Sequence, residues 1–161
     1  MASQRNLDKA YLRMCKEWAK LSYAKRRQVG ALIVKDGQII SDGFNGTPAG
    51  FENICEGICG TTLRCVLHAE SNAITKLAKS PHSSEGATLY LTMSPCYECA
   101  KLIIQSGIKR VVYIKDYRAN SGLILLTKAH VVVDKLERID HAYRKTRKTS
   151  TSIPTGDGAG A

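Results

Sequence analysis

Two short motifs carry residues whose side chains commonly bind transition metals. His68 stands in the sequence HAE, and Cys96 and Cys99 stand in the sequence SPCYEC. One imidazole and two thiolates suit a tetrahedral Zn²⁺ whose fourth position is left for water. An open position of this kind is typical of catalytic zinc, because structural zinc usually has four protein ligands.

Glu70 follows His68 by two residues and is not needed as a ligand. From there its carboxylate can reach a water on the metal without binding the metal itself. Zinc brings the pKa of such a water towards neutrality, and a nearby carboxylate can then take the proton. The spacing therefore predicts a catalytic proton shuttle at Glu70.

Other interpretations fit either motif alone. The Cys-x-x-Cys pair could be a redox pair or half of a zinc knuckle, but a redox motif would leave His68 and Glu70 without a role. A structural zinc module with a binding role would need a fourth protein ligand. The two motifs together, with Pro95 before the first cysteine, favour the catalytic site.

Helices and strands are expected around the motifs. Apolar residues spaced by three or four predict an amphipathic helix whose buried stripe is Leu7, Tyr11, Met14, Trp18 and Leu21. Strands are expected over 29–34 and 38–42, joined by a tight turn at Asp36 and Gly37. Strands over 87–93, 111–114 and 131–133 alternate with helices over 67–79, 96–106 and 123–129, which predicts parallel strands with right-handed crossovers.

The three metal-binding residues then fall at the beginnings of two helices. There the helix dipole favours the thiolate form of Cys96 and Cys99, which metal binding requires.

Length and composition indicate one zinc-dependent domain over residues 1–146 and a flexible basic, Gly/Ser/Thr-rich tail over 147–161. The 161 residues are 43% hydrophobic, and no apolar run is long enough to span a bilayer, so no membrane association is expected. The N-terminal sequence lacks the apolar core of a signal peptide, which predicts a cytoplasmic protein. In that compartment the six cysteines are expected to be thiols or ligands.

The net charge of +10 predicts attraction to phosphate groups, whether of a nucleotide or of a nucleic acid. Part of the charge lies in the run 144–148, which is typical of a solvated chain end. Lys25, Arg26 and Arg27 form a second basic cluster, which could equally be a solvated helix end.

Two further segments have alternative interpretations. The loop 43–50, with three glycines and one proline, could present amides and the Asn45 side chain to a nucleotide, or it could be a plain turn. Cys55 and Cys59 could join His82 in a second, structural zinc site, or they could be buried free thiols.

Three segments together resemble the deoxycytidylate (dCMP) deaminases of phages and eukaryotes. They are GFNGTPAG at 43–50, LHAESNAI at 67–74 and SPCYECAKLI at 94–103. The zinc motifs are shared by all cytidine deaminase-like enzymes, with the glutamate as proton shuttle, whereas the glycine loop points to the dCMP branch. The resemblance covers most of residues 29–114, and the C-terminal third matches weakly.

The resemblance implies a three-layer α/β/α fold with a central mixed five-stranded sheet. It also implies zinc-dependent conversion of dCMP to dUMP and ammonia, which supplies thymidylate synthesis, by a homo-hexamer that dCTP activates and dTTP inhibits with Mg²⁺. The substrate-binding residues that it implies are Asn45, at the deoxyribose, and Ala69, Ser94, Pro95 and Tyr117. The regulatory nucleotide is expected near Lys25, Arg26, Arg27, Gly43, Asn45 and Gly46, away from the zinc motifs.

The alternative function is deamination of a base in tRNA or single-stranded DNA. It would use the same zinc site and benefit from the positive charge, but it calls for aromatic side chains that stack on flanking bases. Aromatic residues are only 6% of the chain, so no specific nucleic-acid partner is expected.

Overall fold

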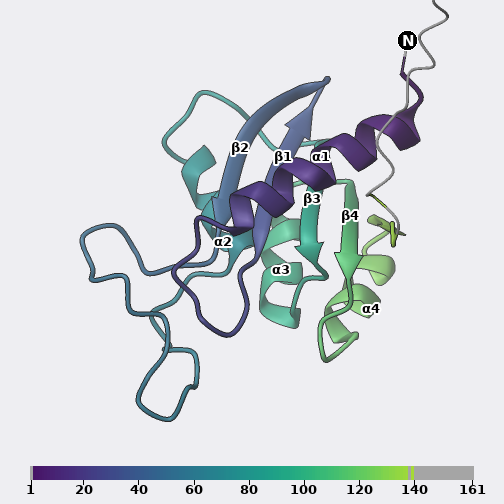
Figure 1. Cartoon of the computed structure of the whole chain (residues 1–161). Coiled ribbons are helices and arrows are strands. Elements are labelled where there is room, and N and C mark those ends of the chain that lie inside the picture. The colour runs from purple at the N-terminus through teal and green to yellow at the C-terminus, as the bar shows by residue number, and fades with distance from the viewer. Residues whose placement is uncertain (1, 138, 140–161) are drawn as a thin grey trace, which may run out of the picture.

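A five-stranded sheet and four helices make up the computed structural model, which describes residues 2–137 and 139 (Figure 1). The helices are α1 (Gln4–Ala19), α2 (Ala69–Leu77), α3 (Tyr97–Gln105) and α4 (Ser121–Lys128). The strands are β1 (Gly30–Lys35), β2 (Gln38–Phe44), β3 (Thr88–Met93), β4 (Arg110–Lys115) and β5 (Val132–Lys135).

The sheet is mixed, with strand order β2-β1-β3-β4-β5. Strand β1 runs antiparallel to both β2 and β3, whereas β3, β4 and β5 are parallel. Helices α3 and α4 are the crossovers of the parallel half, as the alternating pattern predicts. At the tip of the β1–β2 hairpin Asp36 and Gly37 have φ values of 50° and 76°, so the predicted tight turn is confirmed.

The core has two parts, one on each face of the sheet. Helices α2, α3 and α4 cover one face, where Ile33, Leu89 and Val111 are fully buried. Helix α1 lies across the other face, over Leu32 and Tyr90 (Figure 1). Successive strand residues alternate between the two faces, so the molecule has the predicted α/β/α layers.

The predicted buried stripe of α1 is only partly correct, since Tyr11 packs against the core but three other members do not. Leu7, Met14 and Leu21 are 38%, 39% and 53% exposed, and the buried residues of the helix are Asp8, Leu12, Cys15 and Ala19. The burial periodicity is helical, but the buried face is offset by one residue. A charged residue can occupy this face because Asp8 is fully paired within the core.

Asp8 is 3% exposed and accepts hydrogen bonds from three other side chains. Arg110 on β4 donates two at 2.9 Å, Tyr90 on β3 donates one at 2.6 Å, and Gln4 donates one at 2.9 Å. Burial alone would raise the pKa of Asp8, but these hydrogen bonds outweigh burial and hold the pKa below its usual value. The group fixes α1 to the centre of the sheet.

Some predictions fall outside these observations. The basic run 144–148 and the tail 147–161 lie outside the described residues, as do residues 140–143 of the predicted domain. Within the described part of the chain, no helix has both the length and the apolar character needed to cross a membrane.

Candidate metal centre and active site

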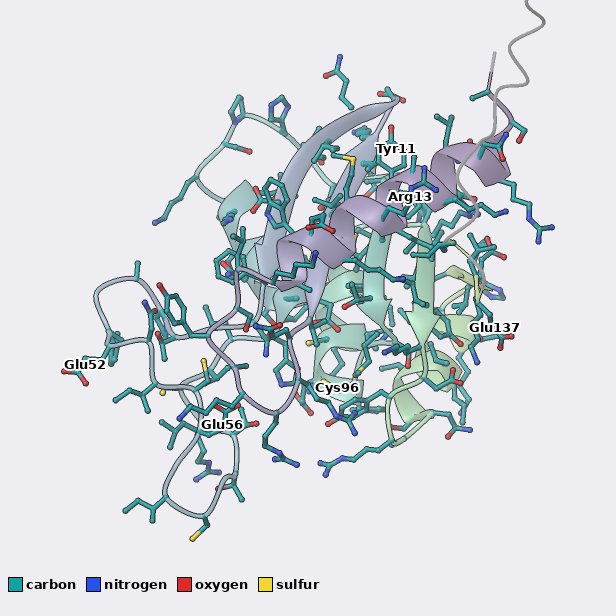
Figure 2. The ribbon with its side chains drawn as sticks, viewed as in Figure 1. Tyr11, Arg13, Glu52, Glu56, Cys96 and Glu137 are labelled. Atoms are coloured by element: carbon teal, nitrogen blue, oxygen red, sulfur yellow. The ribbon has the colours of Figure 1, made fainter. Side chains whose placement is uncertain are left out.

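The two metal-binding motifs lie at the first turns of α2 and α3. His68 is the residue before α2 and Cys96 the residue before α3, both with extended backbone, and Cys99 follows inside the first turn of α3. Cys96 lies at the end of the sheet where β3 ends (Figure 2). Cys96 thus lies at the carboxyl end of β3, where open α/β sheets usually carry their binding sites.

Two glycines allow these turns to pack closely against neighbouring backbone. A Cβ at Gly43 of β2 would collide with the carbonyl oxygen of Ala69 in the first turn of α2. A Cβ at Gly122 of α4 would collide with the carbonyl oxygen of Pro95, next to Cys96. The motif at His68 is therefore packed against β2, and the motif at Cys96 is packed against α4.

His68, Cys96 and Cys99 form a group able to hold a metal ion, and it is the only group of three or more such side chains found within residues 2–137 and 139. The His68 Nδ1 atom lies 3.4 Å from the Sγ atoms of both cysteines. Tetrahedral zinc with bonds of about 2.1 Å to nitrogen and 2.3 Å to sulfur would separate such atoms by about 3.6 Å. The donor set and its spacing therefore fit Zn²⁺.

The pKa values of the two cysteine thiols are shifted in opposite directions. A hydrogen bond from Cys99, supported by His68, lowers the pKa of Cys96 to about 3. The same hydrogen bond, together with burial, raises the pKa of Cys99. The contact with His68 favours the thiolate form of Cys96, which metal binding requires, and the Ser71 hydroxyl lies 3.6 Å from the Cys99 Sγ atom.

Glu70 is only 4% exposed and lies in the first turn of α2, beside the three metal-binding residues. Burial raises the pKa of its carboxyl group to about 7. A carboxyl with a pKa near neutrality can both accept and return a proton, which suits a shuttle.

A cavity of about 570 Å³ opens over Glu70, His68 and Cys96. Its volume falls in the range of small-ligand sites. Four of the five residues predicted to bind substrate line it: Asn45, Ala69, Ser94 and Tyr117. Pro95 is buried and is not part of the lining.

The predicted regulatory residues divide between this cavity and other places. Arg26 and Arg27 line the cavity, so the structure does not separate them from the zinc motifs as expected. Lys25, Gly43 and Gly46 do not line it. Gly43 is a packing position, and Gly46 pairs with Leu67 through two backbone hydrogen bonds of 3.1 and 2.8 Å.

Asn45 uses its side-chain amide to bind backbone. Its Oδ1 accepts a hydrogen bond of 2.8 Å from the Val29 amide, and its Nδ2 donates one of 2.8 Å to the Arg27 carbonyl. The amide thus joins the end of β2 to the segment before β1. This contact is an alternative to the deoxyribose contact expected from the sequence.

A hydrogen bond joins Ser94 and Tyr117, which both line the cavity. The Ser94 hydroxyl, buried at the end of β3, accepts a hydrogen bond of 2.7 Å from the Tyr117 amide. The Arg118 guanidinium lies 5.6 Å from the centre of the Tyr117 ring. Sequence reasoning missed Arg118 and Arg64, which also line the cavity, because neither lies in a motif.

The second zinc site that Cys55, Cys59 and His82 could have formed is not present among the described residues. Cys55 is buried, whereas Cys59 and His82 are exposed, and these side chains form no metal-binding group in the part of the chain that the structure describes. The alternative of buried thiols holds for Cys55 alone. Spacing of four residues suggested a site, but the segment 47–66 is irregular and does not place its sulfurs as a helix would.

Residues 5–115 match the model of the cytidine and deoxycytidylate deaminase zinc-binding region. The chain belongs to this deaminase family. Deaminases of this family include the deoxycytidylate deaminase of phage T4, which is 39% identical over 134 residues (58% of this chain and 69% of the relative). That of Mycobacterium phage D29 is 38% identical over 129 residues, covering 71% of this chain and 98% of the relative.

A solved deaminase structure agrees with the fold. The dCMP deaminase of cyanophage S-TIM5, in complex with dCMP and dUMP, superposes with a TM-score of 0.81 at 42% identity, covering 84% of this chain and all of the other. The chain is therefore a deaminase with the cytidine deaminase-like fold, and its donor set and family both indicate Zn²⁺.

Proposed function

We propose that this protein hydrolyses dCMP to dUMP and ammonia. The observation that carries the proposal is the buried carboxyl of Glu70 beside the His68, Cys96 and Cys99 group, at the floor of a cavity large enough for a nucleotide. The relatives named dCMP deaminases, including one whose structure contains dCMP and dUMP, support this choice of substrate.

Glu70 carries the proton transfers in this mechanism. Zinc on His68, Cys96 and Cys99 would supply a Lewis acid that acidifies water. Glu70 accepts one proton of the water whose oxygen adds to C4 of cytosine and passes it to ring N3. It then takes the remaining proton from the C4 hydroxyl and delivers it to the amine, which leaves as ammonia as the C4 carbonyl forms. A single group can do this because its pKa, raised by burial to about 7, lies close to the working pH.

The other walls of the cavity would orient the nucleotide. Ala69, Ser94 and Tyr117 line the same cavity as Glu70, and the Ser94 hydroxyl fixes the backbone of the segment that carries Tyr117. We place the base between these walls. Pro95 lies between Ser94 and Cys96 in the sequence and does not line the cavity.

The direct experiment is to measure ammonia release from dCMP, dCTP, cytidine and single-stranded DNA. We expect turnover of dCMP at a kcat/KM at least about tenfold above that of the other three. Preferential turnover of single-stranded DNA or tRNA would instead establish the nucleic-acid function. Absence of turnover of dCMP by zinc-loaded protein would contradict the proposal.

Metal analysis tests the proposed ligands separately. We expect about one zinc per chain, and we expect Cys96→Ala to lose both zinc and activity because two side chains cannot complete the site. Cys59→Ala is the matched control, since Cys59 is exposed and outside the group. Full activity in Cys96→Ala would contradict the assignment.

Regulation by dCTP and dTTP with Mg²⁺ is part of the same proposal. A second cavity of about 610 Å³ is lined by Lys16, Lys20 and Lys115 and shares Arg26 and Arg27 with the first. A triphosphate bound in the second cavity would change how Arg26 and Arg27 contact the substrate in the first. Titration of dCTP and dTTP, with Mg²⁺, against dCMP turnover tests this, and an unchanged rate at saturating concentrations of both would exclude it.

The remaining parts of the proposal concern assembly and cellular role. We place the enzyme in the cytoplasm as a homo-hexamer that supplies dUMP for thymidylate synthesis. The exposed apolar side chains Phe51, Ile54 and Ile58, at 64%, 53% and 108% exposure, support self-association. The mass of the assembly in solution tests the oligomer directly.

A further inference from the structure

A stripe of basic side chains runs along one side of α1. Its members follow one another at intervals of three or four residues, which places them on the same side of a helix. They are Arg5, Lys9, Arg13, Lys16 and Lys20. None belongs to the buried face of α1, and three of the five are exposed. From first to last the stripe extends about 22 Å along the helix axis.

The N-terminal part of this stripe is not neutralised by acidic side chains. The two acids of α1 are Asp8 and Glu17. Asp8 is buried in the hydrogen-bonded group described above, and Glu17 pairs at 2.8 Å with the lysine at the C-terminal end of the stripe. Among the described residues, no acid forms an ion pair with Arg5, Lys9 or Arg13. These three cations therefore present their charge to the surroundings.

The arrangement of the stripe opposes the stability of the helix that carries it. Like charges four residues apart repel each other, and the stripe contains three such pairs. Arg5 also lies in the first turn, where the helix dipole favours acidic side chains, and this turn contains none. A helix surface that served only solubility would gain from alternating acids and bases. The uniform positive charge is thus better explained by an anionic partner.

The stripe is also separate from the two cavities over its N-terminal half. Arg5, Lys9 and Arg13 line neither of them. Arg13, labelled in Figure 2, donates a hydrogen bond of 3.2 Å to the Ile139 carbonyl. In the sequence, the basic run 144–148 begins five residues after Ile139. A partner bound along this half of α1 would leave the metal-binding group accessible.

The other side chains of α1 indicate which kind of anion suits the stripe. A single-stranded nucleic acid is usually held by aromatic side chains that stack on its bases. Tyr11 and Trp18 of α1 are turned to the β1–β2 hairpin instead, where they hydrogen-bond to the Gly37 carbonyl at 3.1 Å and to Asp42 at 2.7 Å. An anionic membrane would call for an apolar helix face that enters the lipid, but the apolar face of α1 is packed on the sheet.

We infer that the basic stripe of α1 binds the phosphate backbone of double-stranded nucleic acid without reading its sequence. A straight, rigid row of cations matches a duplex, which carries one negative charge for about every 1.7 Å of its axis. The interaction requires no base contact, and phosphate contacts alone supply non-specific affinity. Binding of this kind is a property of the protein beyond deamination, and it does not rest on the proposed function.

The test replaces the three unpaired cations together, as Arg5→Gln, Lys9→Gln and Arg13→Gln. Fluorescence anisotropy with a labelled 25-base-pair DNA duplex gives the affinity at several salt concentrations. Each lost phosphate contact lowers the slope of log K against log salt by about 0.9, so the slope should fall by about 2 to 3. At 0.1 M salt this corresponds to an affinity about 100- to 500-fold weaker than that of the wild type.

A second triple variant controls for total charge. Lys79→Gln, Lys101→Gln and Lys128→Gln remove the same charge from exposed positions on the helical side of the other sheet face. This variant should lose less than about threefold in affinity for the duplex. Equal losses in the two triple variants would show that only net charge matters and would overturn the inference.

Two further probes distinguish the partner. The wild type should bind the duplex at least about fivefold more tightly than a single strand of the same length, and more tightly than vesicles containing phosphatidylserine. Tighter binding to either of these probes would overturn the assignment to a duplex. If the α1 triple variant loses its far-UV circular dichroism signal, the three single replacements take its place, and each should lower the slope by about 0.9.

Turnover of dCMP separates this surface from the deaminase site. The α1 triple variant should keep its kcat/KM for dCMP within about twofold of the wild-type value, because its replaced residues lie outside both cavities. A loss of duplex affinity that is matched by an equal loss of turnover would contradict a separate surface. Absence of dCMP turnover in the wild type would contradict the proposed function only, since duplex binding is measured without substrate.

Discussion

Glu70 and Asp8 are both buried carboxyl groups, yet their pKa values are changed in opposite directions. Glu70 has few groups that stabilise its charge, so burial raises its pKa to about 7. Asp8 is also penalised by burial, but Arg110, Tyr90 and Gln4 together lower its pKa. The first arrangement suits proton transfer, and the second suits a permanent charge that joins elements of the fold.

Replacing Glu70 by Gln should abolish catalysis without removing the metal. The amide cannot accept or return a proton, so kcat for dCMP should fall by at least about 10²- to 10⁴-fold while zinc content stays at the wild-type value. Glu98→Gln is the control, because Glu98 lies in the second motif but is exposed. Kinetics and metal analysis on the same samples make the comparison, and a variant with more than about a tenth of wild-type kcat would refute the role.

Asp8→Asn should destabilise the protein in a pH-dependent manner. Loss of a buried charge partner of Arg110 should cost about 3 kcal/mol of unfolding free energy at pH 7. Because the pKa of Asp8 is lower in the folded state, its contribution is present above the unfolded value of about 3.9 and is lost as the pH falls through the folded value.

Urea unfolding at pH 7 and at several values below 4 measures this difference. The gap between Asp8→Asn and the wild type should narrow as the pH falls. Glu52→Gln, which changes an exposed acid on the projecting segment (Figure 2), should show no comparable gap. A gap for Asp8→Asn that widens in acid would contradict the assignment.

At the scale of the elements, the first turns of α2 and α3 position the metal-binding residues. The sequence predicts that the metal-binding residues begin two helices, and the structure has His68 and Cys96 in these positions. What the sequence does not reveal is how the two turns are brought together. Gly43 and Gly122 do this by allowing close backbone packing, and a glycine alone in a sequence does not distinguish packing from a turn.

Gly122→Ala should loosen the turn that carries Cys96. The added methyl group meets the Pro95 carbonyl and the Cys96 backbone, so α4 must move, at a cost of about 1–3 kcal/mol in stability. Zinc affinity should fall with it. Gly57→Ala, where the neighbouring atoms leave room, is the control. Thermal unfolding and competition with a zinc chelator measure both effects, and an unchanged Tm would show that α4 adapts freely.

Periodicity predicts element types more reliably than it predicts the buried face. In α1 the large apolar residues Leu7 and Met14 face outward, and the smaller Cys15 and Ala19 face the sheet. Hydrophobicity alone could not indicate this, because Asp8 becomes a core residue only through Arg110, 102 positions away. Arg64 and Arg118 of the cavity escape prediction for the same reason, since their positions depend on contacts between distant segments.

At the scale of the whole molecule, the described residues form a compact α/β/α body and an irregular segment, residues 47–66, that projects from one end of the sheet (Figure 1). The projecting segment supplies Glu56 and Arg64 to the cavity and exposes several large apolar side chains. Motif spacing predicted the metal centre, but it gave no information about this segment, which has no regular periodicity. We propose that its exposed apolar surface provides the contact between copies.

Ile54→Ser combined with Ile58→Ser should reduce the mass of the assembly. The two side chains are 53% and 108% exposed in the single chain, and removing their apolar surface weakens any contact that buries them. Ile39→Ser, at the opposite end of the sheet and 41% exposed, is the matched control. Light scattering during size-exclusion chromatography measures the mass, and an unchanged mass in the double variant would exclude this segment from the interface.

The pairing of β1 with β3 joins two portions of the chain that are far apart in sequence. His68 follows the β1–β2 hairpin, whereas Cys96 and Cys99 follow β3, so the donor atoms come from opposite sides of this junction. Helices and the hairpin form early in folding, but pairings between distant segments close slowly. Cobalt can replace zinc as a coloured probe during refolding. Its thiolate absorption should appear late, when β1 pairs with β3, so the absorption would report completion of the sheet.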